Sequence, residues 1–426
     1  MKIRFFIFLV IAGLIVSTAP SQTIATTDTD NKVHKISFTE FTEMTTNHPQ
    51  KLKKYKQLLN KPGYAVVIYG APVDREMIFN QLLKDKKAPY LFAEGEIDRK
   101  TKKKHKAAEY ALKSSKDKMN TTNKETPYNP FIKKDKSKQY TTSLTIYNYQ
   151  GKIFIQNENY YLPEGMKLSK TITREEIRKK VMSEKGNKQI ASFKKSVQNH
   201  EMEKKFHTDE ISGGSAQLEG SVTDYAHVYG VDKGGEEFLV GIHTTDYLIY
   251  NANDSDTDYD HIIIWTEVQA EPINVVNPAV DAHTSGYQGD IATMYYSDTL
   301  IDWDPSTSSL EVDKGDSVGN FTIGYPATVS WGFNWDGENG AELVTKADKT
   351  PDVGQYTNFW RDSFSKIYPV ATNKFDNEYA VMLRVDTLGG SLSEVEAQTA
   401  QSFSTYWPAY GDSTWGGVIW ELYFNY

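Results

Sequence analysis

The first half of the chain mixes strand-like and helix-like patterns of apolar residues. Residues 64–69 form a short apolar run that stops at Gly70, and this predicts a buried strand. Asp74 follows, and we expect it to cap a helix whose apolar residues at 78, 79, 82 and 83 share one face. Residues 144–147 and 152–155 are strand-like runs around a Tyr-Gln-Gly turn, so they predict a β-hairpin.

Helix signals return towards the end of this half. Thr173 and Glu176 have the spacing of a capping box, which predicts a helix start. We expect Gly186 to interrupt this helix before its apolar period resumes at Ile190. The patterns together predict a mixed α/β region.

The second half shows strand patterns alone. No segment longer than about twelve residues has helical periodicity, and turn residues separate the apolar runs. Several short strands at such spacing favour a β-sandwich. The runs cover residues 238–242, 247–250, 262–268, 292–296, 321–335, 379–385 and 418–426.

The clearest alternation covers residues 321–335. Every odd position is apolar, and the positions between are small or polar. This predicts a single long sandwich strand with one buried face, bent near Pro326. The alternative is a membrane-inserting hairpin of a β-pore-forming toxin, which would need a second amphipathic strand of similar length nearby.

Charge and tryptophan divide the chain at one place. Residues 1–210 carry 40 Lys and Arg against 23 Asp and Glu, whereas residues 211–426 carry 8 against 33 and contain all 8 Trp. We therefore expect a basic, Lys-rich α/β region over residues 26–210 and an acidic, Trp-rich β-sandwich domain over residues 211–426, joined by a linker at 211–215. The predicted fold class is α+β multidomain, with an all-β, sandwich-like C-terminal domain.

The beginning of the sequence has the pattern of a secretory signal peptide. Lys2 and Arg4 precede apolar or small residues from Phe5 to Val16, and a small-residue cleavage site precedes Thr26. Residues 1–25 are thus predicted to direct the protein out of the cytoplasm, as a secreted, extracellular or cell-envelope-associated protein. No later segment is apolar for long enough to be a transmembrane helix. The absence of cysteine excludes disulfides and thiolate metal sites.

Lysine clusters in the basic half predict an anionic partner. Outside the cytoplasm, such a partner is an anionic envelope polymer or a lipid surface and not intracellular nucleic acid. The alternatives are a solvated surface and docking onto the acidic half of the same chain. The clusters are Lys51, Lys53, Lys54 and Lys56; Lys100, Lys102, Lys103, Lys104 and Lys106; and Lys133, Lys134, Lys136 and Lys138.

One acidic loop has the composition of a calcium site. Asp254, Asp256, Asp258 and Asp260 alternate between two predicted strands, so their carboxylates could converge on calcium. The alternative is an acidic, solvated turn. Calcium is the one cofactor that the sequence suggests.

A short stretch resembles the trypsin-like serine peptidases. Gly315-Asp316-Ser317 is followed by the sequence Val-Ser-Trp-Gly at residues 329–332. The resemblance implies a nucleophile at Ser317, with His227 as the base and Asp260 as its partner.

The favoured interpretation is a binding protein without a catalytic set. We expect an exported, envelope-associated or secreted protein that attaches electrostatically and binds an unknown ligand through its β-sandwich domain. The alternatives are a secreted trypsin-like serine peptidase and a β-pore-forming toxin.

Overall fold

The described part of the chain combines a large, mostly β sheet with helices. The computed structural model describes residues 32–93, 138–163, 165–203, 207–208, 215–231, 237–253, 259–273, 283–293, 299–304, 310–311, 317–323, 329–335, 342–350, 353–361, 375–386, 394–407 and 412–425. These residues confirm the mixed α/β character predicted from the sequence.

The largest sheet has nine strands in the order β1-β2-β4-β5-β7-β8-β9-β17-β11. β1 pairs with β2 and β5 pairs with β7 in parallel, and the other neighbours are antiparallel. The strands are β1 (Val33–Ser37), β2 (Ala65–Tyr69), β4 (Lys138–Tyr149), β5 (Lys152–Leu162), β7 (Ser215–Val231), β8 (Glu237–Asn253), β9 (Tyr259–Pro272), β17 (Phe375–Asp386) and β11 (Thr299–Asp304).

Two further sheets contain the other strands of the described residues. A seven-stranded sheet has the order β12-β15-β16-β10-β18-β19-β3, and a three-stranded sheet has the order β13-β14-β6. The strands are β12 (Leu310–Glu311), β15 (Glu342–Thr350), β16 (Val353–Arg361), β10 (His283–Thr293), β18 (Glu394–Trp407), β19 (Asp412–Asn425), β3 (Ala88–Ala93), β13 (Ser317–Ile323), β14 (Val329–Trp335) and β6 (His207–Thr208).

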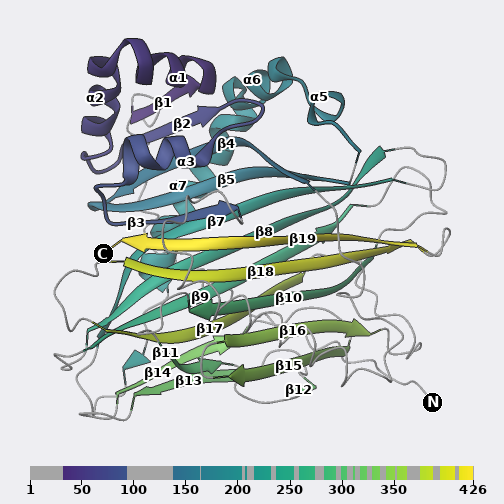
Figure 1. Ribbon diagram of the computed structural model, residues 1–426. Coiled ribbons are helices and arrows are strands. Elements are labelled where there is room, and N and C mark those ends of the chain that lie inside the picture. Colours follow the sequence, from purple (N-terminus) through teal and green to yellow (C-terminus); the bar gives the residue numbers. More distant parts are fainter. Residues whose placement is uncertain are drawn as a thin grey trace, which may run out of the picture.

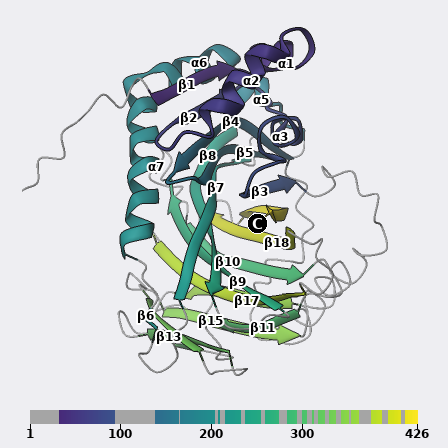
Figure 2. The same cartoon turned by 90° about the vertical axis from the view of Figure 1, so that its left-hand side faces the viewer.

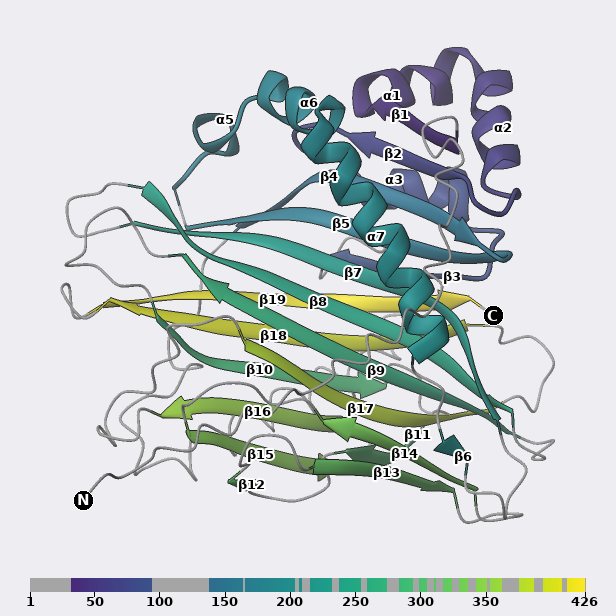
Figure 3. The ribbon, with the colours of Figure 1, turned by 180° about the vertical axis from the view of Figure 1, so that it is seen from behind.

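The long helix α7 and the seven-stranded sheet lie on opposite sides of the nine-stranded sheet. β18 and β19 are in front of it in Figure 1, and α7 is in front in the reverse view of Figure 3. Because parallel strands need a crossover connection, the chain leaves β5, forms α7 on one face and returns as β7. The helices and helical turns are α1 (Phe38–Asn47), α2 (Pro49–Leu58), α3 (Arg75–Ile78), the π-helical turn η2 (Phe79–Leu83), α5 (Leu168–Thr171), α6 (Arg174–Met182) and α7 (Glu184–Glu203). Figure 2 shows α7 running down one face of the sheet, with β1 near its upper end.

One apolar core joins the first and last described strands. Tyr90 of β3 and Phe424 of β19 are at most 1% exposed, and they belong to the same buried cluster as Tyr247 and Ile263 of the nine-stranded sheet. β3 also pairs with β19 along its whole length. The predicted boundary between the two parts of the chain, after Glu210, therefore does not separate the sheets: one sheet contains strands from both parts.

In the nine-stranded sheet, buried hydrogen bonds also link the parts of the chain before and after Glu210. Tyr161 of β5 donates a hydrogen bond of 2.6 Å to the carboxylate of Asp224 on β7, and Asn159 donates a second one. Asp224 is 1% exposed. A buried carboxylate is unfavourable without hydrogen-bond donors. Asp224, which follows Glu210 in the chain, therefore depends on donors from residues that precede it.

Several predicted elements are confirmed. Residues 65–69 are the fully buried strand β2, and β4 and β5 form the predicted hairpin. Asp74 caps α3 by accepting a hydrogen bond of 2.9 Å from the backbone of Met77. Thr173 and Glu176 form a complete capping box at the start of α6.

The predicted helix break at Gly186 was wrong by three residues. The two helices separate at Ser183, whose hydroxyl accepts a hydrogen bond of 3.0 Å from the backbone of Gly186. Gly186 lies inside α7, where an added Cβ would be 2.3 Å from the carbonyl oxygen of Lys180. The glycine is needed for close approach of the two helices.

The prediction of one long strand over residues 321–335 was also wrong. The run contains two antiparallel strands, β13 and β14, with Ile323 opposite Val329. Residues 324–328, including Pro326, lie outside the described residues.

Candidate functional site

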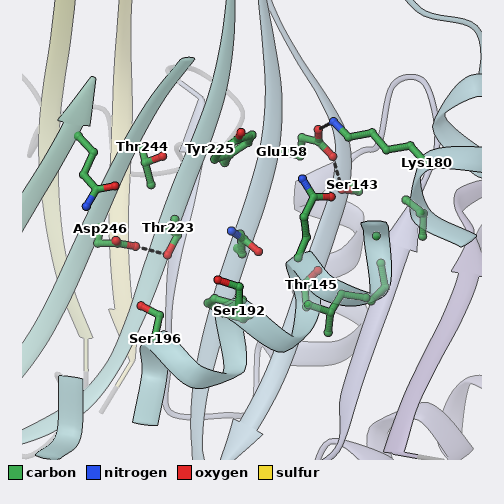
Figure 4. A pocket seen from close by; sticks show the side chains of 18 of the residues that line it. Ser143, Thr145, Glu158, Lys180, Ser192, Ser196, Thr223, Tyr225, Thr244 and Asp246 are labelled. Atoms are coloured by element: carbon green, nitrogen blue, oxygen red, sulfur yellow. Dashed lines mark hydrogen bonds and ion pairs between the residues drawn. The ribbon is translucent and has the colours of Figure 1, made fainter. Parts of the chain in front are cut away.

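A cavity of about 370 Å³ lies between α6–α7 and the nine-stranded sheet. Most of its lining residues have polar side chains. Figure 4 shows Thr223 and Tyr225 on one strand, between the strands that carry Asp246 and Glu158. The lining residues are Val67, Ser143, Thr145, Gln156, Glu158, Lys180, Val181, Gly186, Gln189, Ile190, Ser192, Phe193, Ser196, His200, Thr223, Tyr225, Thr244, Asp246, Glu267 and Gln269.

Strand alternation places the polar residues of the floor side by side. Each of five neighbouring strands contributes two residues that are two positions apart, so both point to the same face. The strand register aligns them across the sheet, with Thr223 opposite Asp246 and Asp246 opposite Glu267. The pairs are Ser143 and Thr145 on β4, Gln156 and Glu158 on β5, Thr223 and Tyr225 on β7, Thr244 and Asp246 on β8, and Glu267 and Gln269 on β9.

The helix α7 forms the roof of the cavity. Gln189, Ser192, Ser196 and His200 recur at helical spacing and line the cavity from above. Between them, Phe193 contacts the ring of Tyr147 on β4 at 6.4 Å between centroids. Apolar residues such as Phe193 therefore pack α7 onto the sheet, while the polar residues of α7 line the cavity.

Glu158 organises one end of the cavity. Its carboxylate forms hydrogen bonds with His227 at 2.9 Å and with the hydroxyl of Ser143 at 3.2 Å, and it also forms an ion pair with Lys180. Burial alone would raise the pKa of Glu158, but the hydrogen bond from His227 and the charge of Lys180 outweigh it and lower the pKa to about 2. The Glu158 carboxylate thus stays charged.

The opposite end is also acidic. The hydroxyl of Thr223 donates a hydrogen bond to Asp246. His200 of α7 lies 3.4 Å from the Glu267 carboxylate, so it connects the roof to the floor. Carboxylates at both ends give the cavity strong acceptors on either side of a row of hydroxyl groups.

Tyr225 supplies an aromatic surface beside Glu158. Burial raises the pKa of Tyr225, and the charges of Glu158 and Glu271 raise it further. Its hydroxyl therefore keeps its proton and remains a donor. The ring meets His227 edge to face at 5.1 Å.

The residues of the predicted serine-peptidase set are not brought together by the described strands. His227 lies opposite Ile242, which lies opposite Glu271 of β9. Asp260 is eleven positions from Glu271 along β9, a separation of roughly 36 Å at about 3.3 Å per residue. Ser317 is the first residue of β13 in a different sheet.

The predicted calcium loop is described only at its end. Asp254, Asp256 and Asp258 lie outside the described residues, and Asp260 belongs to β9. Within the described ranges, no group of three or more His, Asp or Glu side chains could hold a metal ion. No helix in this part of the chain is both long and apolar enough to cross a membrane.

The sequence analysis missed nearly all of the cavity residues. It identified no strand over residues 215–231, because Gly220, Asp224 and Gly230 interrupt the apolar pattern of β7. The available signal was the polar alternation of Ser221, Thr223 and Tyr225 in the printed sequence. Such a pattern is typical of a solvated strand face, and it did not indicate that a helix covers it.

Comparison with known proteins leaves the family of the chain open. No family model matches the sequence, and no curated protein matches it either. Among solved structures, the delta-toxin of Clostridium perfringens has a TM-score of 0.29 and 10% sequence identity, covering 51% of this chain and 93% of the toxin chain.

Proposed function

We propose that the protein is an exported binding protein that holds a small, hydroxyl-rich ligand in the cavity beneath α7. The observation that carries this proposal is the convergence of hydroxyl, amide and carboxylate side chains from five strands and the helix α7 on one cavity. A volume of about 370 Å³ lies within the usual range of small-molecule sites.

The donor and acceptor set suits a neutral sugar or polyol. Each ligand hydroxyl both donates and accepts, so the several hydroxyls of one ligand can donate to a carboxylate such as Asp246 and accept from an amide such as Gln156. Tyr225 and Phe193 add ring surface for the apolar face of a sugar. Glu158 is already neutralised by Lys180, so a neutral ligand leaves no buried charge uncompensated at that end.

Calorimetric titration with a panel of neutral mono- and disaccharides tests the proposal. We expect saturable binding by the wild-type protein and about tenfold weaker binding by Gln156→Leu, which removes one amide from the floor. Gln217→Leu on β7 is the matched control, because Gln217 is exposed and does not line the cavity. Equal affinities of the two variants, or no binding of any sugar by the wild type, would contradict the proposal.

The finer domain organisation forms part of the same proposal. We expect residues 211–426 to complete a β-sandwich whose two layers are the nine-stranded and seven-stranded sheets. Phe424 belongs to one buried cluster with residues of both sheets, which supports this arrangement. Export and attachment to an anionic envelope follow from the signal-peptide pattern and from Lys51, Lys53 and Lys54, which are exposed on α2.

Attachment is tested by sedimentation with vesicles. Anionic vesicles should pellet the protein at low salt and release it at high salt, because surface attraction is screened over about 10 Å at 0.1 M. Vesicles of neutral lipid are the control. Equal pelleting by both vesicle types would contradict electrostatic attachment.

Membrane insertion by a β-hairpin is a second candidate function. One observation favours it: the alternating run forms an antiparallel pair in which Phe321 lies opposite Trp331 and Ile323 opposite Val329. The apolar positions of β13 and β14 therefore share one face of the hairpin. Each strand has 7 residues, whereas a β-strand that crosses a bilayer needs about 9–11 residues. The hairpin would therefore have to extend into the flanking residues to span a membrane.

Dye release from liposomes tests this second candidate. The wild-type protein should release a trapped dye, and Phe321→Asp should abolish release, because a charge on the lipid-facing surface opposes insertion. Thr322→Asp, on the alternate positions, is the control and should leave most of the release intact. Intact liposomes across neutral and anionic lipid mixtures would remove this candidate.

A further inference from the structure

We propose that the cavity beneath α7 holds one end of a neutral sugar chain, and that Tyr229 of β7 binds a further sugar unit outside the cavity. This inference rests on the proposed function and deepens it, because it names an oligosaccharide as the ligand of the same site. The observation behind it is a row of aromatic rings that continues from the cavity along β7.

Tyr225, His227 and Tyr229 share one face of β7. They follow Thr223 at intervals of two positions, so strand alternation points all of them to the face on which the cavity lies. Tyr225 lines the cavity, whereas Tyr229 lies beyond its lining. The Cα atoms of Tyr225 and Tyr229 are about 13 Å apart at about 3.3 Å per residue, which is more than one sugar ring spans.

Tyr160 of β5 connects the rings of this row. The centroid of its ring lies 4.7 Å from that of His227 and 6.0 Å from that of Tyr229, with interplanar angles of 29° and 19°. His227 in turn meets the ring of Tyr225 edge to face at 5.1 Å. Tyr160 is 4% exposed, so a buried ring holds the row in place.

Tyr229 is held by the core but is only partly buried. It packs against a buried cluster that consists of Tyr160, Leu162, Met166 and Leu168. Tyr225 is also partly buried. Rings that are fixed before binding and still reach the surface can stack on the apolar face of a sugar at a low cost in conformational entropy.

The described helices cover only part of this face of the sheet. Figure 3 shows α7 over one end of β7 and β8, and no described helix lies over the other end of β8. The end of β7 that carries Tyr229 is on this second side, because β7 ends at Val231 where β8 begins at Glu237. A chain that leaves the cavity along β7 is therefore not blocked by α7.

Polar side chains of β8 and β9 lie beside the aromatic row. Tyr225 is opposite Thr244, and Thr244 is opposite Gln269 of β9. Figure 4 shows Tyr225 between Thr244 and Glu158. Glu271 follows two positions after Gln269, so it shares the same face, and it is exposed. A stacking ring with hydroxyl, amide and carboxylate groups around it suits a sugar, whose ring faces are apolar and whose edges carry hydroxyls.

The charge at this surface favours a neutral chain over an anionic one. Glu158 and Glu271 lie on either side of Tyr225, on β5 and β9. A sugar hydroxyl can donate a hydrogen bond to Glu271. An anionic sugar would instead be repelled by these carboxylates.

Calorimetric titration of the whole protein tests the inference. The probes are glucose, galactose and N-acetylglucosamine, together with a linear tetrasaccharide of each. We expect the wild-type protein to bind a tetrasaccharide about tenfold more tightly than its monosaccharide. Tyr229→Leu keeps an apolar side chain on the core but removes the ring, so it should lower this ratio to about one. Tyr229→Phe retains the ring and should keep most of the gain.

Tyr64→Leu is the matched control, because Tyr64 is partly buried before β2 and does not line the cavity. Equal affinities of the wild-type protein for monosaccharide and tetrasaccharide would overturn the inference and leave the proposed function intact. The same gain in Tyr229→Leu as in wild type, or an equal loss of gain in Tyr64→Leu, would overturn it as well. Absence of binding of any sugar would reject the proposed function, and this inference with it.

Discussion

Glu158 is the residue on which one end of the cavity depends. Its side chain is 14% exposed, and Lys180, His227 and Ser143 all contact its carboxylate. Replacing it by Gln removes the charge and one of the two acceptor oxygens. We expect Glu158→Gln to lower the free energy of unfolding at pH 7 by about 3 kcal/mol, the value of a pKa lowered from 4.5 to about 2.

The pH dependence of this loss has a definite sign. Because the folded protein holds the Glu158 pKa below its unfolded value, the stabilisation is complete above about pH 4.5 and is lost as the pH falls towards 2. Urea unfolding at pH 7 and at pH 3 should therefore show a smaller difference between wild type and variant at the lower pH. A difference that does not change with pH would mean that the charge of Glu158 is not what stabilises the fold.

His243 makes a second pH-dependent contribution. It is 2% exposed, and burial lowers its pKa to about 3. The unfolded chain binds a proton below about pH 6.5 that the folded protein does not, so stability falls as the pH falls from 6.5. The group alone contributes a slope of about 1.4 kcal/mol per pH unit.

Comparison of wild type with His243→Gln measures how much His243 contributes to the pH dependence of the unfolding free energy. Between pH 6.5 and 5 the unfolding free energy of wild type should fall more steeply than that of His243→Gln. Glu158 changes little in this window because its ordinary pKa is 4.5. Parallel curves for the two proteins would show that His243 is protonated in the folded state.

Single residues differ in how far the sequence predicts them. The capping roles of Asp74 and Thr173 were predictable, since a cap depends on neighbours three positions away. The position of Thr223 beside Asp246 depends on the register of two strands and on a helix that covers them. The strand register and the packing of α7 over the strands depend on residues far apart in the sequence. The cavity could therefore not be predicted from local sequence patterns.

At the scale of elements, the junction of α6 and α7 depends on the size of one residue. A Cβ on Gly186 would lie 2.3 Å from the Lys180 carbonyl oxygen and 2.6 Å from that of Val181. Both contacts are with backbone atoms, so the helices would have to separate. We expect Gly186→Ala to lower the unfolding free energy by about 2 kcal/mol or more, measured by urea denaturation.

A neighbouring substitution controls for composition. Lys185→Ala introduces the same alanine side chain one position earlier, where the native lysine is exposed. This variant should unfold within about 0.5 kcal/mol of wild type. Equal stability of Gly186→Ala and Lys185→Ala would show that α6 and α7 can move apart without cost.

Elements with strong local signals were predicted, and those decided by long-range contacts were not. β2 and the hairpin of β4 and β5 follow directly from apolar runs and a turn. The alternation over 321–335 gave the correct period but not the chain reversal between β13 and β14. The residues 238–242 and 247–250 similarly became one strand, β8, because pairing with β7 and β9 extends through the polar residues between them.

For the whole molecule, the charge division does not coincide with a break in the sheets. β5 pairs with β7 and β3 pairs with β19, so both large sheets contain strands from either side of Glu210. The core cluster that contains Tyr90 and Phe424 crosses the same boundary. Opposite net charge on the two parts is thus compatible with their docking to each other.

Expression of residues 26–210 and 211–426 as separate chains tests this view. We expect neither chain to unfold cooperatively alone, because each loses a strand partner and Asp224 loses the donors Asn159 and Tyr161. Mixing the two chains should restore a cooperative thermal transition and protection of amide hydrogens in β5 and β7. High salt should slow this association if charge attraction drives the encounter. Cooperative unfolding of either chain by itself would show instead that the charge boundary separates units that fold independently.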